Sequence, residues 1–181
     1  MNSTDIIFIG NSITDGGELT ELFNDLRVKN RGINSDDIDG VTDRIDCILA
    51  GRPAKIFLLI GINDVSHNVS LSSLLSKYET LINIICEQSP ESKLYVQSVM
   101  PINNDFNRYK NLRGKEDLIN SFNSGLQELA SQKGIVYIDL WPALAVADSD
   151  KLDPRYTNDG LHLTGEGYLA WANHIKPYLF E

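Results

Sequence analysis

A serine near the N-terminus lies where open α/β sheets carry their ligands. Ser12 comes shortly after the apolar run Ile6–Ile9, which Gly10 ends. Four consecutive apolar residues predict a strand buried on both faces, and such sheets bind ligands at the carboxyl ends of their strands. A serine hydroxyl needs a neighbouring base to act as a nucleophile at neutral pH. We therefore predict that Ser12 is a nucleophile, and that the rest of the chain supplies a base and an oxyanion site.

The base expected for a serine nucleophile is a histidine, and the chain has three. His162 follows Asp159 by three residues, so the carboxylate can accept from Nδ1 and leave Nε2 to face Ser12. The alternative is a plain turn before the last helix, with the histidine as an ordinary surface residue. His67, just past the third predicted strand, is a candidate substrate contact. His174 is expected to pack within a helix.

Three groups at predicted strand ends could donate hydrogen bonds to an oxyanion. They are the backbone N–H of Ser12, the backbone N–H of Gly32 and the side-chain amide of Asn63. Each such donor lowers the barrier to ester cleavage by roughly 3 kcal/mol. Taken singly, Gly32 could belong to a plain turn and Asn63 could cap the next segment. Because these residues occur together with Asp159 and His162, a shared site is the better interpretation.

Strand and helix patterns alternate along the chain. Short apolar runs predict strands at 6–9, 28–31, 56–60, 94–99 and 135–138, and helical spacing predicts helices at 18–26, 35–49, 71–87, 118–129 and 164–179. Nearly continuous apolar strands between helices favour a parallel sheet covered on both faces. We expect one domain, residues 1–181, with a three-layer α/β/α sandwich and a flavodoxin-like five-stranded parallel sheet of order 2-1-3-4-5. That order makes strands one and three neighbours, so Ser12 and Asn63 would share a crevice.

Composition limits the classes of partner. The chain of 181 residues has a formal net charge of -9, which disfavours binding to nucleic acid or to anionic membrane surfaces. No apolar stretch reaches the roughly 18 residues that span a bilayer. We see no secretion signal and therefore expect a cytoplasmic location. Cys47 and Cys86 lie in helical patterns and are expected to be buried thiols rather than a disulfide or a metal site.

The candidate residues resemble, block by block, the SGNH superfamily of GDSL-type esterases and acylhydrolases. The matching blocks are Gly10–Thr14, Asn30–Ile33, Gly61–Asp64 and Asp159–His162, and they span nearly the whole chain. The resemblance implies that Ser12 is the nucleophile, His162 the base and Asp159 its orienting partner. It also implies an oxyanion hole formed by Ser12, Gly32 and Asn63.

Two positions depart from related patterns. The family commonly has aspartate where this chain has Asn11, which removes a charge beside the nucleophile. Thr14 stands at the second glycine of the Gly-x-Ser-x-Gly elbow, which argues against the α/β-hydrolase fold.

The resemblance implies a serine esterase that works through an acyl-enzyme and needs neither a metal nor an organic cofactor. Its compact members, of the platelet-activating-factor acetylhydrolase and sialate O-acetylesterase kind, point to a small-molecule partner: an acetyl ester of a polar alcohol, such as a carbohydrate. The oligomeric state stays open, with a homodimer as one option. The alternatives are a lysophospholipase or thioesterase acting on longer acyl chains, and a non-catalytic carbohydrate-binding module.

The alcohol of the substrate is expected to contact irregular polar segments. Residues 103–114 and 148–158 are such segments, and we expect them to flank the site. The candidate substrate contacts are Asn11, His67, Arg108 and Arg113.

Overall fold

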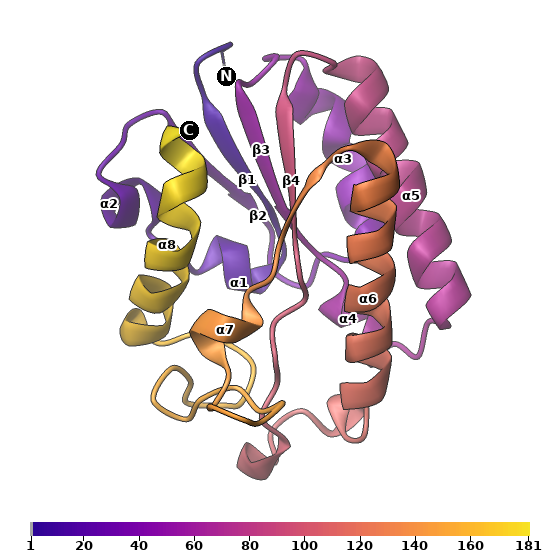
Figure 1. Ribbon diagram of the computed structural model, residues 1–181, viewed down its shortest axis with the longest axis vertical. Coiled ribbons are helices and arrows are strands. Elements are labelled where there is room, and N and C mark those ends of the chain that lie inside the picture. Colours follow the sequence, from indigo (N-terminus) through magenta and orange to yellow (C-terminus); the bar gives the residue numbers. More distant parts are fainter. Residues whose placement is uncertain (1) are drawn as a thin grey trace.

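The sheet has the predicted topology. The computed structural model describes residues 2–181. Five parallel strands lie in the order β2-β1-β3-β4-β5 (Figure 1). Their bounds are β1 Ile6–Gly10, β2 Val28–Gly32, β3 Lys55–Leu59, β4 Lys93–Gln97 and β5 Val136–Ile138. Since β1 pairs with both β2 and β3, the strand order reverses between β1 and β3, where such sheets open a crevice.

Helices cover both faces of the sheet and form the outer layers of a three-layer sandwich. The elements are α1 Ser12–Asp15, α2 Leu19–Phe23, α3 Ile38–Leu49, α4 Ile62–Ser66, α5 Leu71–Gln88, α6 Glu116–Lys133, α7 Trp141–Leu144 and α8 Gly165–Phe180, with short 3₁₀ turns at Asn104–Phe106 and Lys110–Leu112. In Figure 1, α2 and α8 lie on one side of the sheet, and α3, α5 and α6 lie on the other. Among residues 2–181, none of the helices combines the length and the apolar character needed to cross a bilayer.

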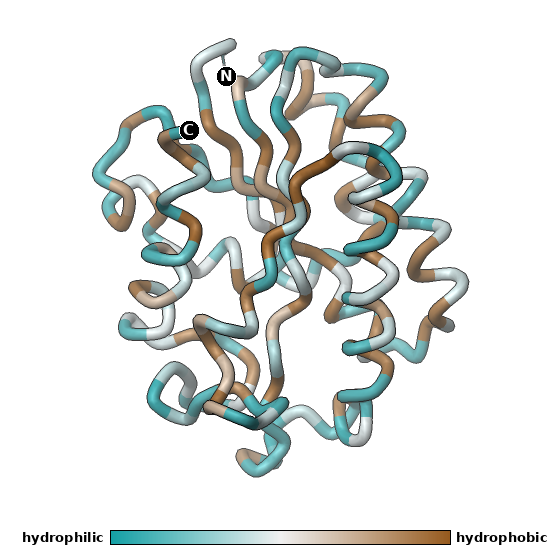
Figure 2. The backbone as a smooth tube through the Cα atoms, viewed as in Figure 1, coloured by the Kyte–Doolittle hydropathy of each residue, from teal (hydrophilic) through white to brown (hydrophobic). Residues whose placement is uncertain are grey.

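The central strands form a rigid apolar floor beneath the site. All five residues of β1 are buried, and the strands are among the browner parts of the tube in Figure 2. The rings of Phe8, Phe57 and Tyr95, paired in register across β1, β3 and β4, stack with centroids 4.6 and 4.4 Å apart. Trp171 of α8 packs its edge on Phe8 at 5.6 Å. Stacked aromatic pairs at this spacing stabilise beyond their buried area, so the strand ends are held firmly.

Helix boundaries differ from the predicted ones at two places. The helix predicted at 35–49 begins later, at Ile38, because the backbone of Ser35 is left-handed, with φ 66°. Asp37 caps this helix by accepting from the Gly40 N–H at 2.9 Å. Helix α2 ends early because Asn24 also adopts a left-handed conformation. Helix α6 ends at Gly134, as predicted.

The two cysteines are exposed rather than buried. The predicted burial of Cys47 and Cys86 is therefore wrong, because both face solvent from their helices.

Candidate active site

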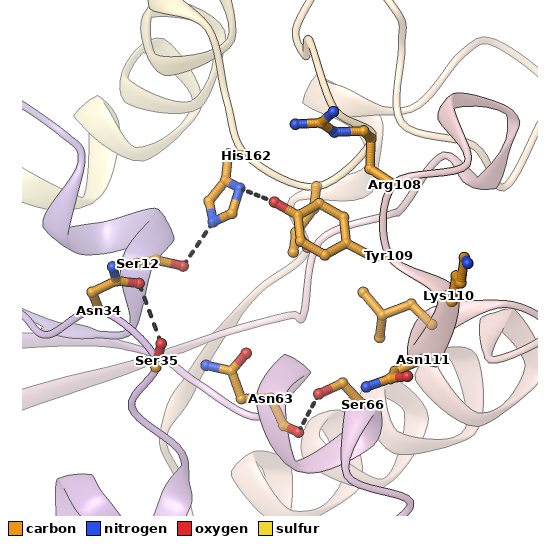
Figure 3. Close-up of a pocket in the computed structure, with 12 residues that line it drawn as sticks. Ser12, Asn34, Ser35, Asn63, Ser66, Arg108, Tyr109, Lys110, Asn111 and His162 are labelled. Carbon is orange, nitrogen blue, oxygen red and sulfur yellow. Dashed lines mark hydrogen bonds between the residues drawn. The ribbon is translucent and has the colours of Figure 1, made fainter.

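Three side chains from the two ends of the chain meet in a hydrogen-bonded row at the switch point of the sheet. Ser12 Oγ lies 2.9 Å from His162 Nε2 (Figure 3). On the other side of the ring, Nδ1 lies 2.8 Å from Asp159 Oδ2. Serine, histidine and aspartate in this order form the arrangement in which the base can take the serine proton while the carboxylate holds the ring.

The turn after β1 positions the serine hydroxyl. Ser12 is the first residue of α1, and the buried Asn11 side chain caps this short helix by accepting from the Ile13 N–H at 3.0 Å. Asn11 is not among the residues that line the pocket. An amide oxygen supplies the same acceptor as a carboxylate, so the cap is preserved although the charge is absent.

Asp159 is held as an acceptor on both of its oxygens. Oδ1 accepts from the backbone N–H groups of Leu161 and His162 at 2.9 and 2.8 Å, and Oδ2 accepts from the His162 ring and from the Tyr109 hydroxyl. Burial acts to raise the pKa of Asp159, but these hydrogen bonds outweigh it and lower the pKa to about 2. The carboxylate is therefore ionised at neutral pH and fixes the ring so that Nε2 faces Ser12.

Tyr109 belongs to this site although the sequence did not point to it. Its hydroxyl lies 2.9 Å from Asp159 Oδ2 and 3.0 Å from His162 Nδ1, and its ring meets the imidazole edge-on at 5.7 Å. Burial first, and then Asp159, raise the pKa of Tyr109 to about 12, so the hydroxyl keeps its proton and donates. The only sequence signal was the location of Tyr109 in the irregular polar segment 103–114.

Asn63 supplies an amide to the pocket. It lies in the first turn of α4, directly after β3, and its Nδ2 donates to the backbone carbonyl of Asp36 at 2.7 Å. A side-chain amide carries two N–H groups, so one remains for a ligand. Ser12, Asn63 and His162 all line the same pocket.

Gly32, which was predicted to be an oxyanion donor, is not among the residues that line that pocket. A side chain at this position would lie 2.7 Å from Asp15 Cα and 2.8 Å from the Asn11 carbonyl oxygen. The glycine is therefore required where α1 packs closely on β2. The neighbouring Ser35 lines the pocket instead.

The pocket has a volume of about 550 Å³, and most of the residues that line it are of polar type. Its serine and asparagine side chains are Ser12, Asn34, Ser35, Asn63, Ser66 and Asn111. Figure 3 shows Ser12, Asn34, Ser35 and Asn63 across from a wall formed by residues 108–112, which includes Arg108, Lys110 and Asn111.

Only some of the predicted substrate-contact residues line the pocket. Arg108 lines the pocket, whereas His67 and Arg113 do not, and residues 148–158 contribute nothing to its lining. Among residues 2–181, no group of three or more His, Cys, Asp or Glu side chains is arranged to hold a metal ion.

Comparison with known proteins agrees with this geometry. Residues 8–170 match the model of a family described as the GDSL-like lipase/acylhydrolase family. The N-acylneuraminate cytidylyltransferase of Escherichia coli is 28% identical over 178 residues, which are 95% of this chain but 39% of that protein. The chain thus spans well under half the length of this curated relative.

Solved structures are similar over nearly the whole chain. A Streptococcus pneumoniae protein, provisionally named as a platelet activating factor, is 31% identical with a TM-score of 0.90, and the match covers 98% of this chain and 85% of that one. An acetyl xylan esterase has a TM-score of 0.79 at 22% identity, with 96% and 98% covered, which shows a shared fold.

Proposed function

Because this chain belongs to the GDSL-like lipase/acylhydrolase family of carboxylic ester hydrolases, we propose that it is a serine esterase for a short-chain ester, acetyl in particular, of a polar alcohol such as a carbohydrate. The observation that carries the proposal is the continuous row of hydrogen bonds from Ser12 Oγ through His162 to Asp159, at 2.9 and 2.8 Å. The alcohol-binding wall, residues 108–112, faces this row.

The geometry supports a two-step acyl transfer. His162 Nε2 takes the Ser12 proton as Oγ attacks the ester carbonyl carbon, and the Asn63 amide donates to the oxyanion that forms. The imidazolium, stabilised by Asp159, then gives its proton to the leaving alcohol. Water, activated by the same ring, attacks the acyl-enzyme and releases the acid with Ser12 restored.

The lining of the pocket supports a short acyl group and a polar alcohol. Its two aliphatic side chains are Leu112 and Leu161, whereas serine and asparagine side chains supply half of its twelve residues. A long acyl chain gains about 0.8 kcal/mol for each methylene it buries, and two leucines offer little surface for this. Hydroxyl and amide groups instead match the hydroxyls of a sugar.

The charge of the pocket supports an anionic alcohol. Arg108 and Lys110 line it without any Asp or Glu in the lining, although the whole chain carries a net charge of -9. Neither cation forms an ion pair with another of residues 2–181. The cytidylyltransferase relative acts on an N-acylneuraminate, which is an acidic sugar. We therefore extend the proposal to O-acetyl esters of acidic sugars.

The esterase proposal is tested by turnover of p-nitrophenyl acetate, butyrate and octanoate. We expect acetate to be the best substrate and Ser12→Ala to lose at least about 1,000-fold in kcat, because among residues 2–181 the hydroxyl at His162 Nε2 is that of Ser12. His162→Ala should lose a similar factor. His174→Ala is the matched control: this partly exposed ring bonds to the Asp139 carbonyl and is not part of the pocket lining, so the variant should keep full activity.

Two results would count against the proposal. A preference for octanoate would favour the lysophospholipase or thioesterase alternative. Equal inactivity of the wild type and Ser12→Ala on all three esters would favour a carbohydrate-binding module.

A further inference from the structure

A second hollow lies at the edge of the sheet, between α6 and the segment that follows β5 (Figure 1). Its volume is about 300 Å³, and it shares no lining residue with the pocket that holds Ser12. We propose that this hollow is a non-catalytic binding site for a neutral sugar. Its lining includes Asn120, Asn123, Gln127, Asp139, Trp141 and Asp150.

Trp141 supplies an apolar surface in this polar hollow. Its indole Nε1 donates to the Val99 carbonyl at 2.9 Å, and its backbone N–H donates to Asp139 Oδ1 at 3.0 Å, so the ring is held in one orientation. Trp141 nevertheless stays partly exposed. The C–H face of a sugar ring can pack on such a surface, and a rigid aromatic side chain loses little conformational entropy when a ligand binds.

A further hollow, of about 360 Å³, adjoins the first. Both are lined by Asp139, Trp141 and Asp150, and residues 145–149 complete the lining of the further one. The polar segment 148–158, which was expected to flank the catalytic pocket, therefore begins at this second location. Two adjoining hollows that share an aromatic ring fit two consecutive units of an oligosaccharide.

The polar side chains of the hollow keep hydrogen-bonding groups for a ligand. Asn123 is 8% exposed and bonds to the backbone of Val99 through Oδ1 and one hydrogen of Nδ2, so one amide hydrogen remains. Among residues 2–181, Asp139 Oδ2 and the side-chain amide of Gln127 form no hydrogen bond. Each hydroxyl of a sugar both donates and accepts, so neighbouring hydroxyls can pair with this mixture of carboxylate oxygens and amide groups.

The charge of the hollow is opposite to that of the catalytic pocket. In the part of the chain that the structure describes, its lining has Asp139 and Asp150 and no Lys or Arg, whereas Arg108 and Lys110 line the catalytic pocket. Neither carboxylate forms an ion pair within residues 2–181. An anionic sugar would be repelled here, all the more because the net charge of the chain is -9. The hollow therefore favours a neutral saccharide, unlike the catalytic pocket.

The two tryptophans of the chain allow a direct test by fluorine NMR. Labelling with 5-fluorotryptophan gives one signal from Trp141 and one from the fully buried Trp171, and Trp141→Phe assigns them. We expect at least one of xylotriose, cellotriose and maltotriose, added up to about 50 mM, to shift the Trp141 signal saturably and to leave the Trp171 signal in place. N-acetylneuraminic acid and choline, the anionic and cationic comparisons, should shift neither signal. Ser12→Ala should bind the trisaccharide as the wild type does, so the outcome is independent of the esterase function.

A double variant tests which side chains hold the sugar. Gln127 and Asp150 are exposed, so Gln127→Ala/Asp150→Ala should keep the fold. The affinity for the trisaccharide should fall about tenfold or more, because two hydrogen-bonding groups are removed. The matched control is Asp117→Ala/Gln132→Ala, which changes the same two residue types at exposed positions of α6 outside both hollows. This control should stay within about twofold of the wild type.

Three results would overturn the inference. They are the lack of a saturable Trp141 shift with all three trisaccharides, equal affinities of the two double variants, and a shift with N-acetylneuraminic acid as large as that with a trisaccharide. A shift with choline alone would also overturn it and would show a site for organic cations instead.

Discussion

The Tyr109 hydroxyl donates to Asp159 Oδ2 at 2.9 Å, the same oxygen that lies 2.8 Å from His162 Nδ1. Tyr109 thus joins the pocket wall formed by residues 108–112 to the pair that orients the base. If substrate binding moved this wall, the position of the His162 ring would change with it.

Removing this hydroxyl should slow the chemical step. In Tyr109→Phe, Asp159 loses one of the groups that lower its pKa, so that pKa should rise, and the ring of His162 is held less firmly. We expect kcat to fall about tenfold, equal to about 1.4 kcal/mol, by the same factor for nitrophenyl acetate and for a sugar acetate. Steady-state kinetics on both esters checks this.

The control for this substitution is Tyr156→Phe. Tyr156 lies outside the pocket, and among residues 2–181 its hydroxyl has no hydrogen-bond partner, so the variant should match the wild type. A loss in Tyr109→Phe that appears only with the sugar ester would show that the hydroxyl contacts the alcohol rather than acting through Asp159.

The parts of the site that could be predicted from sequence are those that the topology places. Apolar runs revealed the parallel sheet, and its order brought the residues after β1 and β3 to one crevice, so Ser12 and Asn63 could be read together. Asp159 and His162 were recognisable because their spacing suits a local hydrogen bond.

The parts that were missed depend on loop conformation. The orientation of Tyr109 is set by a segment with no periodic pattern, and the left-handed turn at Ser35 involves a serine where glycine is the usual residue. Gly32 was predicted to be an oxyanion donor because a glycine lets a substrate approach the backbone closely. In the structure, a glycine is needed at this position because α1 packs closely on β2. Such contacts arise from tertiary packing and leave little trace in a single sequence.

The two pocket cations should select for charge in the substrate. For Arg108→Ala/Lys110→Ala we expect KM for an O-acetylated N-acylneuraminate to rise about tenfold and KM for a neutral sugar acetate to change less than about threefold. The difference should shrink in high salt, because exposed charges are screened. Arg113→Ala, on the same segment but outside the pocket, is the matched control. Equal changes in KM for both esters would argue against an anionic substrate.

Gly160 should be required for the position of the Asp159–His162 loop. Its φ is 87°, its carbonyl accepts from the Asn103 N–H at 2.8 Å, and an added Cβ would collide with the Asn103 carbonyl. Gly160→Ala should therefore lower stability by about 1–3 kcal/mol and kcat by tenfold or more, because the loop must shift. Denaturant unfolding and kinetics measure the two effects.

A second glycine, five residues later, supplies the control. Gly165 begins α8, and a side chain there meets nothing within 4 Å. Gly165→Ala should be neutral or stabilising by up to about 1 kcal/mol, since alanine favours the helix. Equal damage from both substitutions would show that the Gly160 contact has no special role.

Asp64 should make the stability of the protein depend on pH. The side chain is 1% exposed, Oδ2 accepts from the Ile38 N–H, and Oδ1 has no partner among residues 2–181. Burial raises the pKa of Asp64 to about 6, with a further increase from Asp37 and opposing effects from the Ile38 N–H and Lys77. The folded protein therefore binds this proton more tightly than the unfolded chain.

The sign of the effect follows from this difference. As pH rises from about 4 to about 6, ionisation of Asp64 becomes easier in the unfolded chain than in the folded one, so stability falls by up to about 3 kcal/mol and stays lower above pH 6. Asp64→Asn keeps an acceptor for Ile38 and cannot ionise. Relative to the wild type, the variant should gain up to about 3 kcal/mol between pH 4 and pH 8, as measured by urea unfolding at both values. The exposed Asp117→Asn on α6 serves as control, with a difference from wild type that is the same at both pH values. If Asp64→Asn also showed a pH-independent difference, the buried carboxylate would not be the source of the pH dependence.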